Sequence, residues 1–192
     1  FAFIIYDFFY YWFHRISHER QIFWASHAAH HQSEDYNLST ALRQTGTGAF
    51  VSWVFYIPMF LIGIPSYVFV SVASLNLIYQ FWVHSEHIPK LGWYENYFVT
   101  ASNHRVHHAQ NEQYIDKNYG GVFIIWDRMF GTHKIEDENE ACIYGIRSTL
   151  NTFNPVWANL HVYVKIVKEM WLSTSWKDKL YAPFARTSWT PA

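Results

Sequence analysis

The sequence predicts an all-α membrane protein, a helical bundle with a hairpin of membrane helices and a histidine-rich body on the cytosolic side. Residues 44–83 contain no Asp, Glu, Lys, Arg or His, a run too long for a soluble core helix. The 12 histidines recur at helical spacings. Aromatic residues make up 21% of the chain and charged residues 15%, a balance that favours a membrane boundary.

The first segment, residues 1–13, is apolar and reads FAFIIYDFFYYWF. It has neither a basic leader nor a small-residue cleavage site, so we expect the end of a membrane helix that begins upstream rather than a signal peptide. Asp7 is its one charged residue, and a carboxylate in lipid is costly unless it is paired or turned inward. Asp7 is therefore either a hydrogen-bond partner of a histidine or a residue near the membrane interface.

The next stretch, HRISHERQIFWASHAAHH, places five histidines within residues 14–31. In helical segments His14 and His18 lie on one face, and the HxxHH spacing would aim three further rings in one direction. A second HxxHH and an HxxH follow far downstream, which suggests one metal site closed by folding. The candidate ligands are His14, His18, His27, His30, His31, His84, His104, His107 and His108, with His87 as a further ring of the HxxH.

Three polar residues, Glu34, Asp35 and Asn37, follow the first HxxHH. Their ordinary meaning is a surface loop that leads into a helix. Alternatively, they accept hydrogen bonds from the outer ring nitrogens of the histidines, as carboxylates beside metal sites commonly do.

Gly63 and Pro65 divide the uncharged run 44–83 into two halves, which predicts a membrane hairpin. The alternative is a buried hairpin of a soluble protein. Arg43 and Lys90 flank the run, so in a membrane hairpin they share one face with the histidines, and the positive-inside tendency makes that face cytoplasmic.

Further along, Asn154 and Pro155 form a helix start signal, with a capping residue followed by proline at the first helical position. This helix would lie on the bilayer surface or pack against the rest of the chain. We therefore expect a main domain over residues 1–150 and a helical extension over residues 151–192.

The composition restricts the chemistry. The formal charge of −1, without a basic tract, gives no reason to expect a nucleic-acid partner. The single Cys142 excludes an internal disulfide and a cysteine-based zinc site. Neutral imidazoles suit iron, zinc or copper. One tetrahedral ion needs four ligands, so the surplus of histidines favours a dinuclear site with two iron ions.

The motifs HRISH, HAAHH and HRVHH resemble the histidine boxes of the membrane fatty acid hydroxylase and sterol desaturase superfamily. Its alkylglycerol monooxygenase-like branch is closer still, because DFFYYWFHR, EDYNLSTALRQ, LIYQFWVH, DKNYGG and WDRMFGT are similar to segments of that branch. The resemblance covers about residues 1–150. It implies a helical membrane fold with a non-haem di-iron centre, which uses dioxygen to hydroxylate, desaturate or cleave a lipid such as a sterol, a fatty acid or an alkylglycerol.

The resemblance also assigns ligands. The eight histidines of the three boxes carry over, and His84 stands where relatives usually keep another histidine. His87 departs from the pattern, because close relatives have an apolar residue there. Pro89 also biases the end of that segment away from helical geometry. We therefore expect His87 to be an outer or surface histidine, although His84 and His87 are near neighbours if one helix carries both.

The sequence has no GxGxxG after a strand and no CxxC, so electrons must come from a separate donor. The resemblance implies tetrahydrobiopterin in the alkylglycerol branch and a small haem protein or ferredoxin in others. It also implies a multi-pass protein of the endoplasmic reticulum in a eukaryote or of the inner membrane in a bacterium.

The competing interpretation is a membrane metal-binding protein without oxygenase activity. A transporter predicts polar residues through the spans, and residues 44–83 have no ionisable group. A zinc hydrolase needs a glutamate base, for which Glu19 or Glu86 is available, but it leaves the surplus histidines unexplained.

Overall fold

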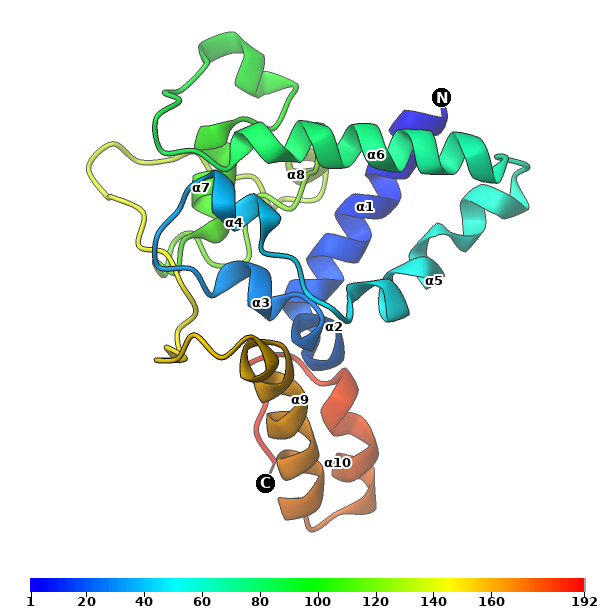
Figure 1. Ribbon diagram of the computed structural model, residues 1–192, viewed down its shortest axis with the longest axis vertical. Coiled ribbons are helices and arrows are strands. Elements are labelled where there is room, and N and C mark those ends of the chain that lie inside the picture. The colour runs from blue at the N-terminus through cyan, green and yellow to red at the C-terminus, as the bar shows by residue number, and fades with distance from the viewer. Residues whose placement is uncertain (192) are drawn as a thin grey trace.

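The computed structural model describes residues 1–191 and is all-helical, as predicted (Figure 1). Within these residues, strand-type pairing is limited to isolated bridges. The four longest helices are α1 (Ala2–Glu19), α5 (Gly48–Leu61), α6 (Ser66–Val83) and α9 (Pro155–Leu172). The shorter elements are α2 (Gln21–Ala25), α3 (Ala28–His31), α4 (Leu38–Leu42), η1 (Gly92–Asn96), α7 (Ala101–His108), α8 (Ile125–Met129), α10 (Trp176–Tyr181) and η2 (Ala182–Phe184).

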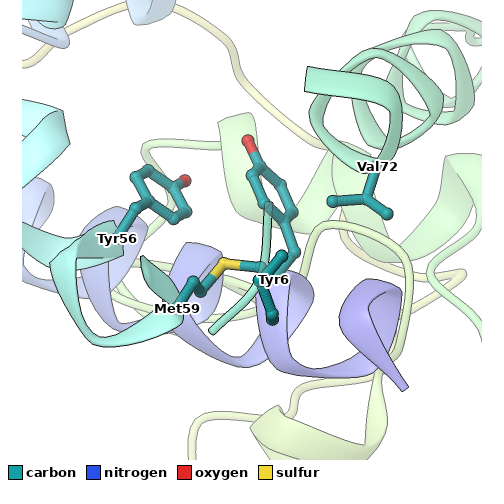
Figure 2. Packing of buried hydrophobic residues seen from close by; sticks show 5 residues of the cluster. Tyr6, Tyr56, Met59 and Val72 are labelled. Carbon is teal, nitrogen blue, oxygen red and sulfur yellow. The ribbon is translucent and has the colours of Figure 1, made fainter. Parts of the chain in front are cut away.

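Helices α5 and α6 form the predicted hairpin and meet in a tight turn (Figure 1). Gly63 in this turn has a φ of +87°, a conformation that glycine adopts without steric cost. Both helices pack on α1, where the ring of Tyr6 stacks on that of Tyr56 with centroids 4.8 Å apart. Met59 and Val72 belong to the same cluster (Figure 2).

The outer faces of the hairpin are apolar and exposed. Helix α6 is long and apolar enough to cross a membrane, and little of it is buried within the described residues. Helix α5 is apolar but shorter. The exposed side chains include Phe50, Trp53, Leu61, Leu75, Leu77 and Ile78. An apolar surface of this kind marks an interaction site, either with a membrane or with another protein.

Helix α9 begins where the sequence predicts it, because the Asn154 side chain accepts hydrogen bonds from the amides of Val156 and Trp157. The helix packs against α2 and α3 through a small apolar cluster of Ala25, Ala28, Val162 and Ile166. In Figure 1, α9 and α10 run side by side and extend away from the hairpin. Of the two alternatives for this helix, the structure therefore shows packing against the body.

One helix does not carry both His84 and His87. Helix α6 ends one residue before His84, which has a ψ of 65°. The chain beyond it is held in an irregular path by Arg105 of α7, whose guanidinium donates to the carbonyls of Ser85 and Ile88 at 3.0 and 2.8 Å. These tertiary hydrogen bonds replace the helical ones.

Candidate metal centre

Five histidines place one ring nitrogen each within 4.8 Å of one another, and we call them the five-histidine group. The nitrogen Nε2 of His27 lies 3.1 Å from Nε2 of His14 and 3.1 Å from Nε2 of His31. His14 and His18 lie on α1, His27 precedes α3, His31 ends α3, and His107 lies on α7.

Four further histidines form a second cluster with the same spacing, the four-histidine group of His30, His84, His104 and His108. Nitrogen Nε2 of His84 lies 3.2 Å from Nε2 of His30 and 3.0 Å from Nε2 of His104. All four side chains are buried, whereas His18 and His27 of the five-histidine group are half-buried.

Each HxxHH box supplies both groups. In the first box, His27 and His31 join the five-histidine group and His30 joins the four-histidine group. In the second box, His104 and His108 join the four-histidine group and His107 joins the five-histidine group. The reason is helical geometry, since positions i and i+4 lie about 40° apart around the axis while i+3 and i+4 lie about 100° apart. The expectation that one box aims its three rings in a single direction is therefore wrong.

The two groups touch each other. The rings of His31 and His108, one from each group, stack with their centroids 4.2 Å apart. Those of His104 and His107 lie 5.2 Å apart. Ions held by the two groups would therefore be neighbours, as in a dinuclear centre.

Backbone carbonyls hold several of the rings in place through Nδ1. The ring of His14 contacts the carbonyl of Tyr119 at 2.8 Å, and that of His107 contacts Lys117 at 3.0 Å. In the four-histidine group, His84 contacts the carbonyl of Gln80 at 2.7 Å, and His30 is held in the same way by Arg43. An N–H donated from Nδ1 leaves Nε2 with a free lone pair, the form that binds a metal.

The three polar residues after the first HxxHH, for which this outer role was one alternative, are not used in that way. Glu34 and Asp35 are exposed, and Asn37 accepts a hydrogen bond from the amide of Ser39 as the cap of α4. The surface-loop alternative is therefore the correct one for these three residues. A local capping bond forms within a few residues, so it outcompetes a reach back to the preceding histidines.

Asp7 is fully buried, yet its hydrogen bonds are not to a histidine. Its carboxylate accepts from the side chains of Asn76 and Trp126 and from the amides of Val122 and Phe123, at 2.8 to 3.0 Å. It thus anchors a loop that packs beside the site. Four hydrogen-bond donors surround the Asp7 carboxylate, which explains why it is tolerated in a buried position.

A second buried carboxylate, which the sequence reasoning missed, acts on the same loop. Asp127 accepts from the amides of Tyr119 and Gly120 at 2.7 and 2.8 Å and from the hydroxyl of Thr132 at 2.7 Å. Burial raises the pKa of Asp127 to about 6. Because the Tyr119 carbonyl contacts His14, Asp127 positions a ring of the five-histidine group indirectly.

The glycine pair in this loop is required by close packing rather than by flexibility. A Cβ on Gly120 would lie 2.7 Å from the Phe123 carbonyl oxygen and 2.9 Å from an Asp127 carboxylate oxygen. A Cβ on Gly121 would lie 2.9 Å from the carboxylate of Asp7. The backbone can therefore reach both carboxylates only without side chains.

The electrostatics of the groups suit a metal. Burial lowers the pKa of His27, His31, His104, His107 and His108 well below the usual value, so these rings are neutral at physiological pH. Nitrogen Nε2 of His18, His107 and His108 is buried without a hydrogen-bond partner. Buried nitrogens that converge without partners are costly in a bare protein and are what a bound cation would satisfy.

His87 belongs to neither group and is exposed, as expected from the sequence. The nine other candidate histidines all lie in the two groups.

Arg105 lies between two candidate ligands of the second HxxHH and forms a bidentate ion pair with Glu136, with both contacts at 2.7 Å. It fixes α7 to the loop that follows α8.

A cavity of about 390 Å³ opens beside the five-histidine group. Its lining includes His18, His31 and His107, with Trp24 of α2 and, from the other group, His108. The candidate metal centre therefore faces the cavity mainly through the five-histidine group.

The fatty acid hydroxylase family model matches residues 1–132, which contain all nine clustered histidines. The chain belongs to this family. It is 47% identical to human alkylglycerol monooxygenase over 190 residues, which cover 99% of this chain and 42% of that protein. It is 47% identical to the Xenopus tropicalis alkylglycerol monooxygenase over 185 residues, which cover 96% of this chain and 41% of that protein.

A more distant relative is human lathosterol oxidase, 28% identical over 142 residues, which cover 67% of this chain and 42% of that protein. This chain thus spans about two fifths of the length of these curated relatives. No solved structure matches it.

Proposed function

We propose that this chain is the catalytic part of a membrane-bound non-haem di-iron oxygenase that oxidises a lipid, with an alkylglycerol-type ether lipid as the favoured substrate. The observation that carries the proposal is the division of nine histidines into two touching groups. The alkylglycerol monooxygenases that match nearly the whole chain support the choice of substrate. A sterol or a fatty acid is the alternative lipid.

The residues present fit two iron ions. His14, His18, His27, His31 and His107 would hold one, and His30, His84, His104 and His108 the other. When bound, the pair of ions would supply the activation of dioxygen. The protein keeps the rings neutral through burial, fixes their direction through backbone carbonyls and admits the lipid through the cavity beside the five-histidine group.

The membrane setting is part of the proposal. The exposed apolar faces of α5 and α6 support a membrane hairpin, with residues 1–150 as the catalytic domain and residues 151–192 as a helical extension. The histidines and both ends of the hairpin would share the cytosolic side, in the endoplasmic reticulum or the bacterial inner membrane. Electrons would come from tetrahydrobiopterin or a separate donor protein.

The half-buried Cys142 is a poor reporter of this topology, because burial raises the pKa of its thiol to about 12. In a Cys142→Ala background we expect Gln44→Cys and Glu86→Cys to react with an impermeant thiol reagent from the same side of sealed vesicles. Ser66→Cys, at the start of α6 beside the hairpin turn, should not react from that side. Reaction of the first two variants from opposite faces would contradict the hairpin.

The function is tested by the iron content and oxygen consumption of the full-length protein after iron-replete expression. We expect two irons per chain and oxygen uptake that depends on a glycerol ether lipid. One zinc per chain without iron would favour the hydrolase or transporter interpretation instead. That interpretation uses four ligands and leaves the five others without a role.

A further inference from the structure

The cavity beside the five-histidine group has a far wall made by the end of the chain. Its residues include Ser148 before α9, His161 and Lys165 on α9, and Thr187 and Ser188 after η2. All lie beyond residue 132, where the family match ends. The histidines of the two groups and this wall of the cavity thus come from different segments of the chain.

Hydrogen bonds hold this wall in register with the histidines. Gln32, the residue after His31, donates to the carbonyl of Ala158 in α9 at 2.8 Å. Gln21 donates from its side chain to Glu169 at 2.8 Å, and its amide donates to the carbonyl of Ala185 at 3.0 Å. A helix tied in this way to α2 and α3 keeps a fixed distance from the ligands.

The wall offers neutral hydrogen-bonding groups rather than free charge. The ammonium of Lys165 lies 3.3 Å from a carboxylate oxygen of Glu169. Arg147, which also lines the cavity, forms an ion pair with Glu112. With the charge of both cations balanced by a carboxylate, the wall attracts an anionic headgroup such as a phosphate less than free cations would.

His161 is the distinctive side chain of the wall. Its Nδ1 lies 3.2 Å from the carbonyl of Ala158 and 3.3 Å from that of Trp157, and the amide nitrogen of Gln32 lies farther away at 3.5 Å. Because carbonyls only accept, we assign the proton to Nδ1. Nε2 is then left as an acceptor for a ligand hydroxyl in the cavity. The hydroxyls of Thr187 and Ser188 add groups that both donate and accept.

We propose that His161, Thr187 and Ser188 bind the neutral, hydroxyl-bearing headgroup of the lipid and thereby select the substrate. This inference rests on the proposed function for the reaction itself. The metal groups would act on the part of the lipid near the histidines, and the wall would read the hydroxyls. Lipids without free hydroxyls would leave these cavity groups unpaired, which disfavours their binding.

The first test is modification of histidines by diethylpyrocarbonate in the iron-loaded, full-length protein, read by mass spectrometry. A glycerol monoether lipid with both hydroxyls free should protect His161. The same lipid with both hydroxyls methylated should protect it much less. His87, exposed and outside the cavity, is the internal control and should react equally in all samples.

The second test uses variants of the wall. His161→Leu and Thr187→Val should each raise KM for the monoether about fivefold, the effect of one neutral hydrogen bond, with a smaller change in kcat and unchanged iron content. His161→Gln, which retains an acceptor, should restore part of the affinity. Lys168→Met on the exposed side of α9 is the matched control and should behave as wild type.

The outcomes separate the wall from the reaction. Turnover of the monoether without protection of His161 and without a KM change in the variants would overturn the wall and leave the function intact. Protection of His161 by the hydroxylated lipid without turnover would support the wall and contradict the proposed function. The absence of both turnover and protection would contradict both.

Discussion

The two histidine groups differ in how they are enclosed. The four-histidine group is buried throughout, and only His108 of its members lines the cavity. The five-histidine group has two half-buried members and presents His18, His31 and His107 to the cavity. One set of rings therefore faces the space where a substrate would lie, and the other closes the back of the site.

The supports of the two groups differ as well. In the four-histidine group, His84 is held by a carbonyl of α6, a regular helix, and His30 is held by the carbonyl of Arg43, which follows α4. His14 and His107 depend on carbonyls of residues 119 and 117, which lie in a loop. That loop is held in turn by the buried Asp7 and Asp127. Changes in the loop should therefore affect the five-histidine group first.

The largest effect is expected from the adjacent pair His107 and His108, which belong to different groups. Changes around metal ligands cost about 10-fold to 100-fold in metal affinity, so loss of a ligand should cost at least that and abolish turnover. His107→Ala should release iron from the five-histidine group and His108→Ala from the four-histidine group. Metal analysis combined with iron spectroscopy should give two different residual signals. Identical signals would mean that the groups are not separate sites.

The next comparison is between His84 and His87. His84 is buried with its Nε2 3.0 Å from that of His104, while His87 is exposed. His84→Ala should lose iron from the four-histidine group and lose activity. His87→Leu should keep the metal and most of the activity, and it serves as the control for removal of an imidazole. Equal iron loss in both variants would raise the ligand number to ten.

The sequence predicted the helical hairpin and the nine clustered histidines, because spacing and local hydropathy fix those features. It did not predict the division into two groups, since that depends on where α6 ends and how α7 packs against α3. It offered Glu34, Asp35 and Asn37 as one alternative for the outer hydrogen bonds, whereas backbone carbonyls make them. Every residue has such a carbonyl, so no residue type marks the ones that are used.

A third prediction concerns Asp127, which supports the five-histidine group through the Tyr119 carbonyl. Asp127→Asn replaces one acceptor oxygen with an NH2 group, which cannot accept a hydrogen bond from a backbone amide. A buried donor that is left unsatisfied in this way costs about 1–3 kcal/mol. We expect iron affinity in the five-histidine group to fall about tenfold, the lower end for outer positions, with the four-histidine group unchanged. Metal titration of both groups measures this. The matched control is Asp35→Asn, an exposed carboxylate near the first HxxHH. An equal loss in both groups would contradict independent supports.

We expect the smallest effect on iron affinity from a change at Gly120, which does not itself contact a histidine. An added methyl group would lie 2.7 Å from the Phe123 carbonyl and 2.9 Å from Asp127, so the loop must shift. Overpacking of this kind costs about 1–3 kcal/mol of stability. Because Asp127 keeps its carboxylate and the Tyr119 amide that donates to it, Gly120→Ala should lower the thermal unfolding temperature more than it lowers iron affinity.

The control for this last variant is Gly46→Ala, where the nearest atom to an added Cβ is 3.8 Å away, an ordinary contact. Gly46→Ala should leave both the unfolding temperature and iron binding close to wild type. If Gly120→Ala instead removed iron from the five-histidine group without lowering stability, the loop would control the ligand geometry directly. Its carbonyls would then be as critical as the histidines they hold, and the contrast between the rings held by this loop and those of the four-histidine group would be sharper than the hydrogen bonds alone predict.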